Sequence, residues 1–111
     1  MSDTLSPDTL TRLEATIAAR RQADPSSSYV AKLNARGVPK IAQKVGEEAV
    51  EAVIAAMADD REGLVGEAAD LLFHLMVLLA AKQVPLADVL AELDRREGVS
   101  GIAEKASRKA D

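Results

Sequence analysis

Carboxylates gather at two places in this chain, and both places read as apolar helix. Glu47, Glu48 and Glu51, the first acidic group, lie in KVGEEAVEAV, and Glu67 and Asp70, the second acidic group, lie in GEAADLLFHL. A carboxylate on a helix that is apolar nearly all round costs free energy unless something compensates its charge. Hard oxygen ligands in this number favour Mg²⁺ or Mn²⁺. The spacing therefore predicts binding of a divalent metal.

Helical projection places each acidic group on one narrow stripe between apolar residues. On the first of the two helices, the side facing the core is predicted to carry Ile41, Val45, Ala52 and Val53, and Glu48 borders this side. On the second helix, both acids share their stripe with the only histidine of the chain. The acids are thus ordered on each helix and not scattered round it.

The loop between these two helices is short, so we expect them to pack as antiparallel neighbours. This packing can bring the two stripes face to face. Without a metal the carboxylates would repel one another, and some would have to take up protons. Mg²⁺ binds a few carboxylates together with waters and phosphate oxygens, so the site suits a metal shared with a phosphorylated ligand. The plainer alternative is that the acids are solvated faces of amphipathic helices.

Basic residues accompany the first acidic group. Lys44 and Lys40 lie one and two turns upstream of Glu48 on the same face. A lysine that precedes a glutamate by four residues is the weaker order of ion pair, so local stability explains these lysines poorly and they are candidates for binding phosphates. A loose surface ion-pair ladder is the alternative. Lys105 and Arg108, in the tail, are further candidates for phosphate contacts.

The single histidine, His74, follows Asp70 by one helical turn. A base, a metal ligand and a packed polar residue are all open interpretations. We favour a residue that orients a carboxylate from outside the ligand set.

The pattern of apolar residues, prolines and glycines predicts an all-α single domain over residues 1–111, most simply a four-helix-bundle core. Residues 98–111 are expected to form a flexible tail with one more helical turn after Ser100. The expected helices start at Ser6 and Pro7 and run to about 23, then span Tyr29–Arg36, Pro39–Ala58, Glu62–Lys82 and Pro85–Gly98.

Composition excludes several classes of protein. The net charge of −4 comes from the acidic groups, since without them 13 acidic residues remain against 14 basic ones, and no basic surface indicates nucleic acid. No cysteine is present, so thiolate sites and disulfides are excluded. The start of the chain lacks the pattern of a signal peptide, and no apolar run is long enough to span a membrane, so we expect a cytoplasmic protein. Helices with wide apolar faces in a short chain predict a homodimer.

These motifs resemble those of a known family. EExxE followed by ExxD is similar to the signature of the all-α nucleoside triphosphate pyrophosphohydrolases, and within them the chain most resembles the phosphoribosyl-ATP pyrophosphohydrolases of histidine biosynthesis. SYxAKL and the EKASR tail make the resemblance specific. The supporting segments are Ser28–Ala56, Gly66–Leu79, Val89–Gly98 and Ser100–Arg108.

The resemblance implies a helical dimer that hydrolyses phosphoribosyl-ATP to phosphoribosyl-AMP and pyrophosphate with Mg²⁺. It further implies that Glu48, Glu51, Glu67 and Asp70 are the metal ligands. Glu47 is the remaining acid, which would activate water or hold a second metal.

The expected catalytic groups are accordingly Glu47, Glu48 and Lys44, and the expected phosphate-binding groups are Lys40, Lys44, Lys105 and Arg108. Two alternatives stay open: a house-cleaning nucleoside triphosphate pyrophosphohydrolase, and a helical interaction module without enzymatic activity. A carboxylate-bridged iron protein is disfavoured, because the paired Glu-x-x-His spacing is absent.

Overall fold

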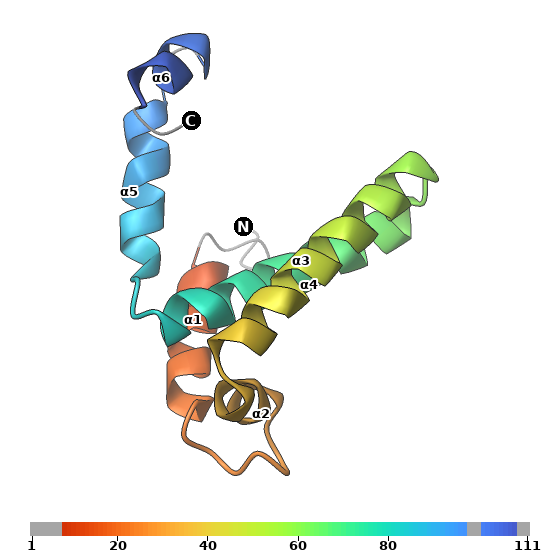
Figure 1. Ribbon diagram of the computed structural model, residues 1–111, viewed down its shortest axis with the longest axis vertical. Coiled ribbons are helices and arrows are strands. Elements are labelled where there is room, and N and C mark those ends of the chain that lie inside the picture. Colours follow the sequence, from red (N-terminus) through yellow and green to blue (C-terminus); the bar gives the residue numbers. More distant parts are fainter. Residues whose placement is uncertain (1–7, 98–100, 109–111) are drawn as a thin grey trace, which may run out of the picture.

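The computed structural model describes residues 8–97 and 101–108. Within these ranges every regular element is an α-helix, which confirms the all-α prediction (Figure 1). Ser6 and Pro7, the predicted start of the first helix, lie outside the described residues, as does part of the predicted tail. The helices are α1 (Thr9–Arg20), α2 (Tyr29–Arg36), α3 (Val38–Met57), α4 (Arg61–Ala81), α5 (Leu86–Arg96) and α6 (Gly101–Ser107).

Local signals fix the ends of α2 and the start of α3. The Ser28 hydroxyl accepts a hydrogen bond from the Ala31 N–H at 3.2 Å and caps α2. At the other end, Gly37 has a φ of 93°, a backbone conformation that favours glycine, and its N–H donates to the Leu33 carbonyl. Pro39 follows in the first turn of α3, where its missing N–H costs nothing. The predicted bounds of α2 are therefore confirmed.

A tight turn joins α3 to α4. The Asp60 carboxylate accepts a hydrogen bond from the Gly63 N–H at 2.9 Å, which caps α4. A Cβ atom at Gly63 would collide with this carboxylate, so a larger residue there would displace the capping side chain. Asp59 takes the positive φ of 56° that reverses the chain. This turn sets α3 and α4 antiparallel and side by side, as the short loop predicts (Figure 1).

The core lies at the end of the α3–α4 hairpin that is remote from this turn. There α1 packs on α4, and α2 packs on α3 and α1. Ile17 and Ile41 are completely buried. The core cluster consists of Ile17, Val30, Leu33, Ile41, Met76, Val77 and Leu86. The bundle-like part of the chain is thus α1 to α4, whereas α5 runs away from it and carries α6 at its far end (Figure 1).

Large apolar side chains remain exposed on the hairpin. Val53, predicted to face the core, is 61% exposed, so that expectation is wrong for one chain on its own. The exposed positions recur at helical spacing on each helix, which makes them stripes and not isolated residues. On α3 they are Val50, Val53, Ile54 and Met57, and on α4 they are Leu64, Val65, Leu72 and Leu75.

Helix α4 has the length and hydropathy of a membrane-spanning helix. Length and composition alone do not separate such a helix from an apolar helix in a protein core, which passes the same test. Glu67 and Asp70 lie in the interior of this helix, where lipid would penalise their charge.

A long-range hydrogen bond holds the start of α5. The Glu14 carboxylate on α1 accepts the Leu86 N–H, at 2.8 Å, across 72 residues of sequence. The first N–H groups of a helix have no partner inside the helix, so this carboxylate supplies one. The Leu86 side chain is buried in the core beside it. Together these contacts anchor α5 at its first turn.

Replacing Glu14 with Ala should lower the free energy of unfolding by about 1 kcal/mol, the usual loss when a helix-capping side chain is removed. Glu14→Gln keeps an oxygen that accepts the bond, so most of the stability should remain. Urea denaturation measures both variants. An equal loss in the two would mean that charge, and not the hydrogen bond, holds α5.

Candidate metal centre

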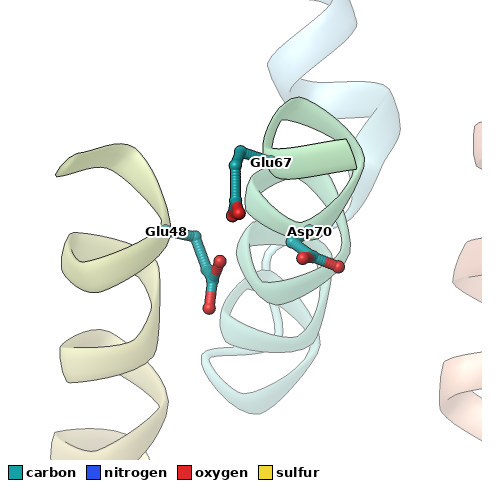
Figure 2. Close-up of side chains that lie close together, drawn as sticks. All are labelled: Glu48, Glu67 and Asp70. Carbon is teal, nitrogen blue, oxygen red and sulfur yellow. The ribbon is translucent and has the colours of Figure 1, made fainter. Parts of the chain in front are cut away.

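Three carboxylates from α3 and α4 converge between the two helices. One oxygen each of Glu48, Glu67 and Asp70 lie within 4.8 Å of one another. Glu48 points from α3 toward α4, where Glu67 and Asp70 lie one turn apart (Figure 2). The antiparallel hairpin is what places these side chains opposite one another, because residues three apart on α4 share a face.

Burial makes this convergence unfavourable for negative charge. Glu48 is only 8% exposed, and the Oε1 atom of Glu67 is buried without a hydrogen-bond partner among the described residues. Contact with the Glu48 carboxyl group, loss of solvent, and the charges of Glu51, Glu48 and Asp70 raise the pKa of Glu67 from 4.5 to about 7. Two ionised carboxylates cannot donate to each other, so the contact between Glu48 and Glu67 is a hydrogen bond only when one of them carries a proton.

The other two acids of the first group lie beside this cluster, outside the three converging oxygens. Glu51 is exposed on α3 and lines a groove together with Glu67. Glu47 is exposed and accepts a hydrogen bond from Gln43 at 2.7 Å. Gln43 and then Lys44 hold the pKa of Glu47 below its ordinary value. Glu47 is therefore a firmly ionised carboxylate at the edge of the site.

Lys44 connects the edge of the site to its centre. Its ammonium lies 3.3 Å from a Glu47 oxygen and 3.6 Å from a Glu48 oxygen. The hydrogen bond to Glu47 is the main reason that the pKa of Lys44 is raised, so its positive charge is secure at neutral pH. Lys40 lies one turn away on α3, and its charge helps to lower the pKa of Glu47. Both predicted lysines therefore accompany the carboxylates.

The tail residues Lys105 and Arg108 are not brought to the carboxylates within one chain. Lys105 lies on α6 and Arg108 directly follows it. Helix α6 is at the far end of α5, away from the α3–α4 hairpin (Figure 1). A role for these two residues at the same site would need a second copy of the chain.

His74 is a packed polar residue, 5% exposed, with both ring nitrogens hydrogen-bonded. Its Nδ1 atom lies 2.7 Å from the backbone carbonyl oxygen of Asp70, and its Nε2 atom lies 2.8 Å from the Tyr29 hydroxyl. The favoured interpretation, that His74 orients a carboxylate, stays a prediction, because the observed bond goes to the backbone of Asp70 and not to its carboxylate. Tyr29 was not foreseen as a neighbour of the site, although it lies in the SYxAKL motif.

The donor set fits a hard divalent cation. Carboxylate oxygens are the ligands that Mg²⁺ prefers, and three of them leave coordination positions for water and phosphate. The buried, unpartnered oxygen of Glu67 supports this fit, because a cation would supply the positive partner that the protein does not. The same cation would offset the repulsion between Glu48 and Glu67, which otherwise favours a proton on one of them.

Fold and site together define an all-helical protein with a candidate divalent-metal centre between two antiparallel helices. The sequence profile of the family described as phosphoribosyl-ATP pyrophosphohydrolase matches residues 10–97. The chain belongs to this family, which confirms the resemblance seen in its motifs.

Curated relatives agree with this assignment. A protein of Rhizorhabdus wittichii named phosphoribosyl-ATP pyrophosphatase is 78% identical over 100 residues, which cover 90% of this chain and 94% of the relative. One of the same name from Novosphingobium aromaticivorans is 78% identical over 99 residues, covering 89% and 92%. A third, from Erythrobacter litoralis, is 70% identical over 101 residues, covering 91% and 97%.

The metal-free protein should lose stability as the pH rises. Because the pKa of Glu67 is raised from 4.5 to about 7, the folded state binds more protons than the unfolded state in that window. The stability that this proton supplies is fully present below 4.5 and is lost as the pH rises through about 7.

Thermal denaturation in chelator at about pH 5 and about pH 8 measures this loss, which Glu67→Gln should reduce. Saturating Mg²⁺ should restore the melting temperature at the higher pH. A pH profile that Glu67→Gln leaves unchanged would assign the loss to other groups.

Proposed function

We propose that Glu48, Glu51, Glu67 and Asp70 hold Mg²⁺ for the reaction of this family. That reaction is the hydrolysis of phosphoribosyl-ATP to phosphoribosyl-AMP and pyrophosphate, the second step of histidine biosynthesis. The observation that carries the proposal is the convergence of the three carboxylates, and the buried, unpartnered Oε1 atom of Glu67 supports it. Glu51 joins this set as the neighbour whose charge acts on Glu67 from the adjoining groove.

Bound Mg²⁺ would draw off the negative charge that develops on the phosphates as the phosphoanhydride bond breaks. Lys44 and Lys40 balance the remaining charge of the polyphosphate from the α3 side. Glu47 orients the attacking water through its free lone pairs, since Gln43 and Lys44 already fix its carboxylate. Its lowered pKa makes it a weak base, so orientation is its main contribution.

The house-cleaning alternative keeps this chemistry but changes the substrate to a canonical or damaged nucleotide. Turnover of phosphoribosyl-ATP compared with a panel of nucleoside triphosphates separates the two. The helical interaction module without enzymatic activity is excluded by the match to the pyrophosphohydrolase family and by the relatives named phosphoribosyl-ATP pyrophosphatase. The experiment that tests the proposal is therefore pyrophosphate release from phosphoribosyl-ATP, with and without Mg²⁺.

We further propose that the protein acts as a homodimer in the cytoplasm. The exposed apolar stripes of α3 and α4 are too extensive for a lone chain in water, and helices of a second copy would cover them. Val50 and Ile54 line one groove together with Glu47 and Glu51. A partner seated there would lie directly beside the acidic site.

Replacing Glu48 or Asp70 with Ala should reduce the rate of pyrophosphate release by several orders of magnitude, because each removes an oxygen from the metal centre. Glu62→Ala, which removes an exposed carboxylate from the first turn of α4, is the matched control and should leave the rate unchanged. Circular dichroism checks that the helices persist. Near-normal activity of Glu48→Ala at saturating Mg²⁺ would remove that residue from the mechanism.

Val53→Asp should convert the dimer to a monomer, since it places a charge in the centre of the exposed stripe. Gln22→Asp makes the same change of charge at an exposed position in the α1–α2 loop and should remain dimeric. Sedimentation velocity measures both. A wild-type chain that sediments as a monomer at every concentration would contradict the proposed dimer.

A further inference from the structure

A chain of two hydrogen bonds connects α2 to the acidic part of α4. It runs from the Tyr29 hydroxyl to His74 Nε2, at 2.8 Å, and from His74 Nδ1 to the backbone oxygen of Asp70, at 2.7 Å. Tyr29 is the first residue of α2, and Asp70 contributes a carboxylate to the candidate metal centre. The chain therefore ends at the helical turn from which one of the converging side chains projects.

The chemistry of the Asp70 carbonyl fixes the direction of one of these two hydrogen bonds. A carbonyl oxygen only accepts, so His74 Nδ1 carries a hydrogen. The second partner of the ring is the Tyr29 hydroxyl, at Nε2. A hydroxyl can donate or accept, so this bond and the bond to the Asp70 carbonyl form together with hydrogen on Nδ1.

Aromatic packing holds the tyrosine in this position. The Tyr29 ring stacks on Phe73 at a centroid distance of 5.9 Å, and it meets the His74 ring edge-on at 5.7 Å. Phe73 and His74 also pack edge-on, at 5.2 Å. Three rings in mutual contact restrict the rotation of each, which favours the rotamer that brings the Tyr29 hydroxyl to His74.

Helix α2 also packs against α3, through Val30 and Leu33, which share a core cluster with Ile41. It thus touches both helices that carry the carboxylates, α3 by apolar packing and α4 by the Tyr29 hydroxyl. A brace of this kind sets how far α3 and α4 stand apart near the site. Metal affinity depends on that separation, because ligand oxygens must match the short distances of the ion.

We propose that Tyr29 and His74 are positioning residues of the metal centre, which brace α2 between α3 and α4 and so hold Asp70 at the correct distance from Glu48. The inference rests on the proposed function, because it concerns the same site. It adds a role for two residues that contribute no oxygen to the three-carboxylate cluster.

The first test determines which ring nitrogen of His74 carries hydrogen. His74 is the only histidine, so its ring nitrogens can be assigned without ambiguity in long-range ¹H–¹⁵N spectra of the untagged protein. The expected result is hydrogen on Nδ1. A ring with hydrogen on Nε2 alone would overturn the hydrogen bond to the Asp70 carbonyl.

The second test separates the two bonds of His74. Tyr29→Phe removes the hydroxyl but keeps the stack on Phe73. His74→Asn keeps a donor for the Asp70 carbonyl and loses the reach to Tyr29, whereas His74→Gln keeps an acceptor for Tyr29 and loses the donor. Tyr29→Phe and His74→Asn should each weaken Mg²⁺ binding about tenfold, and His74→Gln should retain most of the affinity.

Asn34→Ala supplies the matched control. Asn34 also joins α2 to a neighbouring segment, through hydrogen bonds with Arg21 at the end of α1. This variant should lower the melting temperature and leave Mg²⁺ affinity unchanged. Calorimetry of Mg²⁺ binding and thermal denaturation, run on all four variants, separate positioning from plain stability.

The outcomes distinguish the two proposals. A wild-type chain that binds Mg²⁺ but releases no pyrophosphate from phosphoribosyl-ATP would defeat the proposed function, while the order of affinities still tests the brace. Tyr29→Phe with wild-type Mg²⁺ affinity in an active enzyme would overturn the brace alone. Absence of Mg²⁺ binding to the wild-type chain would overturn both.

Discussion

Repulsion between carboxylates held against one another by two packed helices is the constraint on which this structure depends. Glu67 is surrounded by Glu48, Glu51 and Asp70, and one of its oxygens is buried without a donor. The two helices cannot relieve this repulsion by moving apart. The Asp60 turn at one end and the core at the other hold α3 and α4 together. The charge must be compensated in place, by a proton or by a cation.

The rest of the chain serves this geometry. Ser28 caps α2, Gly37 ends it and Asp60 caps α4, so local signals set where these helices begin or end. Burial of Ile17 and Ile41 stabilises the end of the hairpin remote from the turn. The exposed apolar stripes of the hairpin are left for a second copy under the proposed assembly.

The sequence predicted the helices and the acidic stripes well, because prolines, glycines and capping residues act locally and a helical period is easily recognised. The family resemblance named Glu48, Glu67 and Asp70, which converge, together with Glu51, which lies outside the three converging oxygens. Glu47 and Glu48 are adjacent in sequence, yet Glu47 faces Gln43 and solvent while Glu48 is buried, a difference that depends on the rotation of α3 against α4. The direction of α5 could not be predicted either. It depends on the hydrogen bond from the Leu86 N–H to Glu14, which lies 72 residues away in sequence.

Environment therefore divides carboxylates of the same kind into two chemical types. Glu47, with a donor amide and an ammonium beside it, has a lowered pKa and stays ionised, whereas Glu67, with carboxylates beside it, has a pKa raised to about 7. Titratable groups whose surroundings push their pKa values apart commonly have separate tasks in one reaction. The first type suits the orientation of a water at the edge of the site. The second type, Glu67, suits a metal ligand. A cation would remove the repulsion between the carboxylates, and this gain strengthens cation binding.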